Sequence, residues 1–213
     1  MLVAVNFVGH IAVGLASGEA RPAFLVGTAL PDFASMARTR LGRAHGALGD
    51  GIATHHAADH AFHGQPWFLE LERELRASLS QAGLPDGAAR ACAHVGPELL
   101  LDGALVDDPD VARAVGSVYD ELADPSAVVV DLVAPDERVR WRDHLVGVTR
   151  RLDPLRYRDA DVVAQRLHAV ASRRPRLAFD DDLVDTVAVE MRRVQPHVSA
   201  SARDVVTNVV DAL

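Results

Sequence analysis

The sequence predicts an all-α protein, a single compact domain of about ten helices. Apolar residues recur with helical periodicity along nearly the whole chain, and proline or glycine interrupts them at intervals typical of helical domains. The only strand-like run, residues 127–134, has no second strand to pair with, so we expect a loop or short helix there. A chain of 213 residues can bury one sizeable core. We therefore expect residues 1–213 to form one domain, with the distinctive motifs in 5–105 and a helical remainder in 106–213.

The elements of the first third follow from this punctuation. A first helix is expected from Asn6 to Ser17, and a second from Pro22 to Leu30. The second should end at Pro31, because proline disfavours helical dihedrals in the residue before it. A polar segment, Met36 to Ala47, then leads to a third helix from about Leu48 to His63.

The later elements are also helical. The segment PWFLELERELRASLSQAG, which begins at Pro66, is amphipathic, with Glu70, Glu72 and Arg73 expected to face water. A helix from Asp86 to Leu105 contains the pair Gly96-Pro97, so either this helix is kinked or a new one begins at Pro97. Further helices are expected at 109–123, 136–151, 159–173, 181–194 and 199–212.

Composition excludes several function classes. All 22 basic residues are arginines, so the chain can form no Schiff base and supplies no lysine to a P-loop. A net charge of −8 argues against a protein that binds nucleic acid in bulk. With Cys92 as the only cysteine, no internal disulfide or thiolate zinc site can form, and we expect a buried thiol and a cytoplasmic location. The apolar N-terminal stretch lacks a basic flank and is too short for a membrane span.

Histidine is concentrated in the third predicted helix and just before it. Five of the ten histidines fall within residues 45–63. Positions four apart lie on one face of a helix, so His55, Asp59 and His63 stack over roughly 12 Å. His56 and His60 form a second pair beside them, so periodicity alone leaves the register open. We prefer the set that includes the carboxylate.

The same spacing recurs at His94, Glu98 and Asp102. Two such sets of side chains on facing helices would supply nitrogen and oxygen ligands without sulfur, a combination that suits one or two ions of manganese, iron, zinc or magnesium. His10 and Asp32 are further candidate ligands, with a hydrogen-bonded core histidine and a helix cap as the respective alternatives. The remaining histidines lack partners at ligand spacing and are expected to be structural or exposed: His45, His144, His168 and His197.

Four segments resemble, in order, the acyl carrier protein phosphodiesterase family: NFVGH, FLVGTALPDF, GIATHHAADHAFHGQPWF and HVGPELLLDG. These are helical proteins similar to the HD-domain metal phosphohydrolases, and the resemblance covers about residues 5–105. It implies an HD-domain-like metal-binding core with these ligands: His10, Asp32, His55, Asp59, Glu98 and Asp102. The family commonly has an acidic residue in place of His63 and Asp-His in place of Asp102-Gly103.

A weaker resemblance is to the bacterial zinc-dependent phospholipase C group, which is secreted and uses its mature N-terminus as a ligand. It implies a zinc site formed by His10, Asp32, His55, Asp59, His63, His94 and Glu98. Both resemblances imply cleavage of a phosphodiester.

We therefore expect metal-assisted phosphodiester hydrolysis, in which a bound divalent ion lowers the pKa of water and neutralises phosphate oxygens. The candidate catalytic residues are Asp59, His63 and His94, and either histidine could ligate the metal or protonate the leaving oxygen. The candidates for binding a phosphate are Arg38, Arg40 and Arg43. The alternative is that these arginines lie in a solvent-exposed connecting segment.

The first resemblance also implies a partner, acyl carrier protein, whose 4'-phosphopantetheine would be released. That protein is strongly acidic, so a chain of charge −8 would need a local basic patch, for which the candidates are Arg138, Arg140, Arg142, Arg150 and Arg151. Two other classes fit the sequence. A di-iron oxygenase would use the same ligands for dioxygen chemistry, and a non-catalytic binding module would bind no metal.

Overall fold

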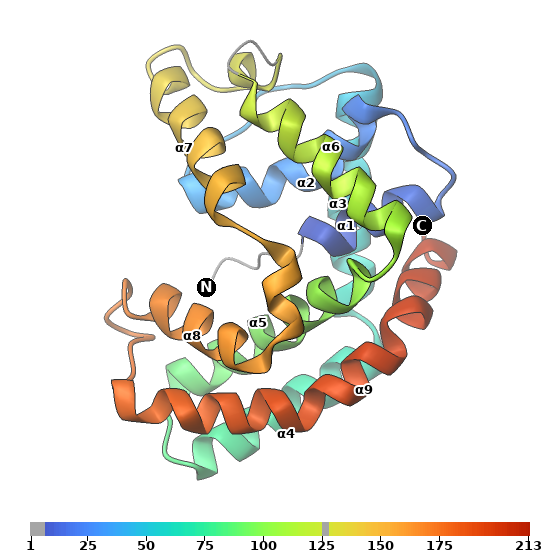
Figure 1. The fold of residues 1–213 in the computed structure, drawn as a ribbon. Helices are drawn as coiled ribbons and strands as arrows, with labels where there is room; N and C mark the ends of the chain where they lie inside the picture. Colours follow the sequence, from blue (N-terminus) through green and yellow to red (C-terminus); the bar gives the residue numbers. More distant parts are fainter. Residues whose placement is uncertain (1–6, 125–127) are drawn as a thin grey trace.

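The computed structural model describes residues 7–124 and 128–213 and confirms the all-α prediction. Within these ranges the chain forms nine α-helices and three short 3-10 helices, and no strand (Figure 1). The α-helices are α1 (Phe7–Ala16), α2 (Pro22–Ala37), α3 (Gly46–His63), α4 (Pro66–Gln81), α5 (Asp86–Leu105), α6 (Pro109–Ala123), α7 (Arg138–Arg151), α8 (Ala160–Ala171) and α9 (Val184–Asp211). The 3-10 helices are η1 (Val128–Leu132), η2 (Pro154–Arg158) and η3 (Asp181–Leu183).

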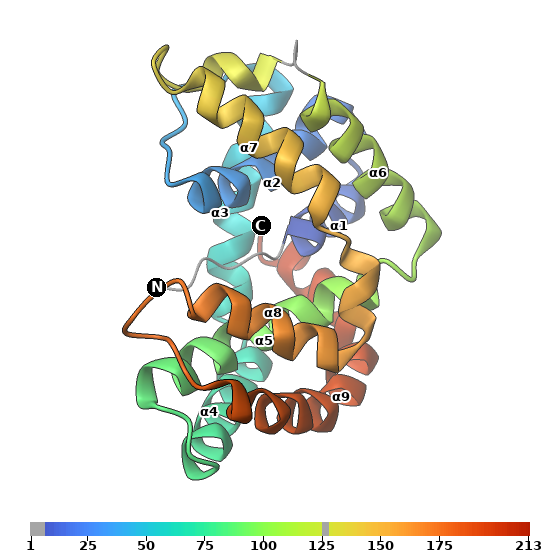
Figure 2. The ribbon, with the colours of Figure 1, turned by 60° about the vertical axis from the view of Figure 1, so that its left-hand side comes forward.

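The helices gather into two groups. α2, α6 and α7 pack together in one group, and α4, α5, α8 and α9 pack together in the other (Figure 1). α3 packs most extensively on α2 and also reaches α4 and α9, so it runs along both groups (Figure 2). α1 contacts both groups as well. α1 and α3 therefore connect the two halves of the molecule.

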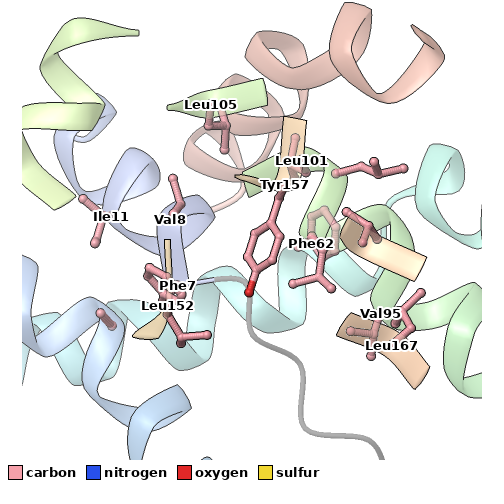
Figure 3. Close-up of a cluster of buried hydrophobic side chains, with 14 of the residues drawn as sticks. Phe7, Val8, Ile11, Phe62, Val95, Leu101, Leu105, Leu152, Tyr157 and Leu167 are labelled. Atoms are coloured by element: carbon pink, nitrogen blue, oxygen red, sulfur yellow. The ribbon is translucent and has the colours of Figure 1, made fainter. Parts of the chain in front are cut away.

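The hydrophobic core is built around α1. Residues Phe7 to Gly14 are all buried, and Phe7, Val8 and Ile11 have no exposed surface. Figure 3 shows part of this core, where side chains of α1 lie in one cluster with Phe62 of α3 and Leu101 of α5. Because every face of α1 is covered, a polar side chain on α1 needs a partner inside the protein.

Three prolines lie inside helices, and two of them correct the sequence-based boundaries. α2 continues through Pro31 to Ala37, so the prediction that it ends at Leu30 is wrong. α9 runs unbroken through Pro196, so the predicted helices 181–194 and 199–212 are one helix, and nine helices replace about ten. α5 is likewise continuous through Pro97. An internal proline costs about 3 kcal/mol, but burial of side chains on both sides, such as Leu30 and Phe33 in α2, offsets that cost.

Two glycines set the contact between α2 and α3. A Cβ atom on Gly51 would overlap the carbonyl oxygen of Phe24, and one on Gly27 would overlap that of Leu48. Only glycine allows backbones to approach this closely. The close approach brings Asp32 of α2 and His55 of α3 into the same interior region.

The remaining elements agree with the sequence in part. η1 fits the loop or short helix expected for residues 127–134, although residue 127 lies outside the described ranges, as does Asn6, the predicted start of the first helix. η2 was not anticipated. Among the described residues, no helix combines the length and the apolar composition that a membrane crossing requires.

Candidate metal centre

The buried polar side chains of the described chain concentrate at one place. Besides Thr28, which donates to a carbonyl of its own helix, the buried polar and charged residues are His10, Asp32, His55, Glu98 and Asp102. All five are predicted ligands, and they come from α1, α2, α3 and α5. Four helices thus direct nitrogen and oxygen ligands into one interior region.

A first group consists of His10, Asp32 and His55, whose ligand atoms lie within 4.8 Å of one another. Nε2 of His10 is 4.0 Å from Oδ2 of Asp32, and the rings of His10 and His55 lie 3.9 Å apart. Nδ1 of His55 donates to the carbonyl oxygen of Thr28 at 2.8 Å. Since Nδ1 carries the proton, Nε2 of His55 offers a lone pair to the group, an arrangement common for metal-binding histidines.

A second group consists of His63, His94 and Glu98, again with ligand atoms within 4.8 Å of one another. Oε1 of Glu98 lies 3.0 Å from Nε2 of His63 and 3.6 Å from Nε2 of His94. The two imidazoles are stacked, with ring centres 4.9 Å apart. The contact between His94 and Glu98 requires an unbroken α5 through Pro97, which decides between the two alternatives left open by the sequence.

Glu72 orients His94 and was missed by the sequence analysis. Its Oε1 accepts from Nδ1 of His94 at 3.1 Å, so it does not simply face water as expected. The hydrogen bond leaves Nε2 of His94 directed toward Glu98. Glu72 lies on α4, 22 residues before His94, and no spacing within one helix could have identified this contact.

Asp59 lies on α3 midway between His55 of the first group and His63 of the second. Its Oδ1 is 3.3 Å from Nδ1 of His63, whose ring also bonds the Asp59 carbonyl oxygen at 2.8 Å. The hydrogen bond with His63 lowers the pKa of Asp59. Because its side chain is 47% exposed, Asp59 marks the solvent-facing edge of the candidate centre.

Asp102 is buried but belongs to neither three-residue group. Its Oδ1 accepts from the backbone N–H of Gly9 at 3.0 Å, so this carboxylate anchors the first turn of α1. A carboxylate at a helix N-terminus also interacts favourably with the helix dipole. Asp102 thus has a structural contact in addition to its place beside the candidate ligands.

The other predicted residues lie elsewhere. His56 and His60 are exposed and belong to neither group, whereas His55 and His63 each belong to one. Arg38 lines a cavity bordered by α2, α7 and α8, and Arg40 and Arg43 are exposed. The other four histidines outside both groups also lie elsewhere: His45 is exposed, His144 lines that cavity, His168 pairs with Asp181, and His197 accepts from Trp67.

The carboxylates of the centre are incompletely satisfied. Oδ2 of Asp32, Oε2 of Glu98 and Oδ2 of Asp102 are buried and have no hydrogen-bond partner among the described residues. Burial raises the pKa of Asp32 well above its usual range, and the nearby charges of Glu98 and Asp59 raise it further. Burial also raises the pKa of Asp102, although the bond from Gly9 acts in the opposite direction.

The histidines divide into neutral and charged. Burial lowers the pKa of His10 well below its usual value and lowers that of His55 to about 4, so both are neutral at pH 7. Burial also acts to lower the pKa of His63, but hydrogen bonds with Asp59 and Glu98 outweigh it and raise the pKa to about 10. Both nitrogens of His63 face oxygen atoms, as expected for an imidazolium.

These features fit a divalent metal. Buried polar atoms normally have partners, yet three carboxylate oxygens here have none, and among the described residues no arginine pairs with Asp32, Glu98 or Asp102. A cation would satisfy the unpaired oxygens, and the neutral imidazoles of His10 and His55 are in the form that binds metal. The mixed nitrogen and oxygen set suits zinc, manganese, iron or magnesium.

Comparison with family models, with curated proteins and with solved structures gives no match for this chain. The geometry of the candidate centre therefore carries the functional inference.

Proposed function

We propose that this protein is a metal-dependent phosphodiester hydrolase whose helical core is similar to that of the HD-domain phosphohydrolases. One observation supports the proposal most directly. Three buried carboxylates, each with an oxygen that lacks a partner among the described residues, converge with imidazoles from three helices; His63 faces Glu98, but no arginine of the described chain pairs with any of the three. Such a site is costly to maintain unless a cation binds there.

The chain offers ligands for two ions. His10, Asp32 and His55 would hold one ion, and His63, His94 and Glu98 the other. Asp59 lies between them on α3, and Asp102 adjoins both groups electrostatically through Asp32 and Glu98. When bound, divalent ions at this position would activate water for attack and neutralise the oxygens of a phosphodiester.

The protein's own side chains would orient and supply protons. The backbone carbonyl oxygen of Thr28 and the side-chain carboxylate of Glu72 fix the rings of His55 and His94 by accepting hydrogen bonds from their Nδ1 atoms. His63 is 27% exposed at the edge of the centre and keeps its proton through bonds to Asp59 and Glu98. If His63 is not a ligand in the loaded protein, it is placed to protonate a leaving oxygen, and Asp59 then holds its ring in position.

The substrate class follows from the same reasoning. Water attack on a phosphodiester releases a phosphate monoester and an alcohol, and the 4'-phosphopantetheine linkage of acyl carrier protein is the substrate that the sequence resemblance favours. The partner would have to meet a basic surface on a chain of net charge −8. Arginines of α7 remain candidates, although Arg138 and Arg140 are already paired with Asp131 and Glu137.

A matched pair of variants tests the proposal. His55→Ala removes a ligand, whereas His56→Ala removes the exposed neighbouring histidine and serves as the control. After loading with manganese, zinc, iron or magnesium, elemental analysis should find one or two ions in the parent and in His56→Ala, with at least one lost in His55→Ala. Hydrolysis of bis(p-nitrophenyl) phosphate should be lost in His55→Ala only.

Three results would contradict the proposal. Absence of metal from the parent after loading would favour a binding module, and retention of all metal by His55→Ala would place the ions elsewhere. Iron binding with dioxygen consumption but without phosphodiester hydrolysis would favour an oxygenase.

A further inference from the structure

A second candidate site lies in a cavity of about 430 Å³ bordered by α2, α7 and α8. Its volume falls within the range of small-molecule sites, about 300–1,000 Å³. Its polar lining is dominated by arginine: Arg38, Arg151, Arg166, Arg173 and Arg174, together with His144. None of these residues is a candidate metal ligand.

The described lining of the cavity holds no acidic side chain to offset three of its arginines. No aspartate or glutamate lines the cavity. Arg38, Arg151 and Arg173 form no ion pair among the described residues, and residues 1–6 and 125–127 include no acidic residue. Elsewhere arginines do pair, as in Arg113 with Asp110. Concentrated positive charge in a concave site raises the local concentration of anions.

One hydrogen-bond donor in the wall of this cavity lacks an acceptor. Nε of Arg166 is buried and unpartnered in the part of the chain that the structure describes. The His144 ring is held in place, since it stacks on Trp141 and bonds the backbone of Phe33. Buried polar atoms without partners are rare in proteins, and an anion in the cavity would supply the acceptor that Nε of Arg166 lacks.

The rest of the lining is apolar and comes from Met36, Val148, Leu152 and Val170. A ligand that fills the cavity therefore combines a multiply charged anionic group with a small apolar body. Guanidinium groups bind phosphate in a bidentate manner, and several unpaired arginines favour a dianion over a single carboxylate.

We propose that this cavity binds an organic phosphate monoester, with the phosphate against the arginines and the apolar body against the aliphatic side chains. The inference rests on the arginines and the apolar lining of this cavity and does not depend on the proposed metal centre.

Trp141 provides the readout. The chain has two tryptophans, and Trp141 is buried against His144, so in a Trp67→Phe background its fluorescence reports on the cavity. The probes are phenyl phosphate, inorganic phosphate and benzoate. We expect phenyl phosphate to bind most tightly, because inorganic phosphate lacks the apolar body and benzoate carries one negative charge.

The variant Arg151→Gln with Arg173→Gln removes two exposed guanidinium groups, and Arg113→Gln is the control. Loss of charge-assisted hydrogen bonds should weaken phenyl phosphate binding about tenfold or more, while the control stays close to the parent. Without ligand, the double variant should melt at the same temperature as the parent or higher, because the substitutions remove repulsion between positive charges. A merely structural role for these arginines predicts a lower melting temperature instead.

Binding to this cavity should persist in His55→Ala, which separates its outcome from that of the metal centre. No binding of phenyl phosphate up to about 10 mM, or equal binding by the parent and the double variant, would overturn the proposal. Binding that is lost in His55→Ala would assign the phosphate to the metal centre instead.

Discussion

The substitution Asp32→Asn tests whether the buried carboxylates serve to bind a cation. The change keeps the size of the side chain and removes its charge. Asp32 is 7% exposed, its Oδ2 has no hydrogen-bond partner, and burial with the charges of Glu98 and Asp59 raises its pKa. In the metal-free protein, burial and the neighbouring carboxylates already disfavour the charged form of Asp32, so the variant should differ from the parent by no more than about 1 kcal/mol.

Bound metal should make the stabilities of the parent and the variant differ. At a free concentration of about 100 to 1,000 times Kd, an ion stabilises the parent by about 2.7 to 4.1 kcal/mol. For a chain of this size 1 kcal/mol corresponds to roughly 2–4 °C, so the melting temperature should rise by about 5–16 °C. If loss of the ligand weakens binding about 10- to 100-fold, the gain in Asp32→Asn is smaller by about 1.4 to 2.7 kcal/mol.

The assay is thermal unfolding with and without manganese or zinc, and Asp120→Asn, an exposed carboxylate on α6, is the control. The control should follow the parent under both conditions. If Asp32→Asn lowers the melting temperature of the metal-free protein substantially, or gains as much from metal as the parent does, Asp32 has a structural role and the reasoning is wrong.

Three further outcomes are expected. Gly51→Ala should destabilise the fold by about 1–3 kcal/mol in denaturant unfolding, because its Cβ would overlap the backbone of α2. The control Gly116→Ala, whose Cβ meets no atom within 4 Å, should stabilise the fold by about 0.5–1 kcal/mol. Equal effects of the two substitutions would contradict the close contact between α2 and α3. Burial raises the pKa of Cys92 to about 12, so its thiol should react with DTNB at pH 8 only on unfolding, and rapid reaction in the native state would show an open core. His63 has a pKa of about 10 in the folded protein against about 6.5 for an unperturbed histidine. Its contribution to the stability of the metal-free protein should therefore be complete below pH 6.5 and decline as pH rises toward 10. If the stability of the parent depends on pH in the same way as that of His63→Gln, His63 is not protonated in the folded protein.

The sequence was most informative where a signal lies within one helix. The spacing of His55, Asp59 and His63 predicted a shared face, and the structure indeed distributes these residues along one side of α3. Spacing alone could not choose between His55 and His56. The structure buries Gly51, His55, Ala58 and Phe62 of α3, and the only signal for this in the sequence is that the apolar Ala58 and Phe62 follow His55 at helical spacing.

Features that depend on contacts between helices could not be predicted. α2 passes through Pro31 because packing on both sides of the proline outweighs the lost hydrogen bond, a tertiary effect that local preference does not contain. Glu72 meets His94 only because α4 packs on α5. The arginine cavity likewise draws on α2, α7 and α8, and in the sequence Arg38 and Arg166 are far apart.

The position of α3 along both halves of the molecule has a consequence for how metal would be taken up. His55 and His63 belong to one rigid helix, so an ion held by either group also restricts the motion of the ligand in the other. The second ion would then meet a ligand that is already ordered, and reciprocal linkage requires each ion to strengthen the other by the same factor. Where this ordering outweighs the repulsion between the ions, uptake would be cooperative, with chains mostly empty or doubly loaded at intermediate metal concentrations.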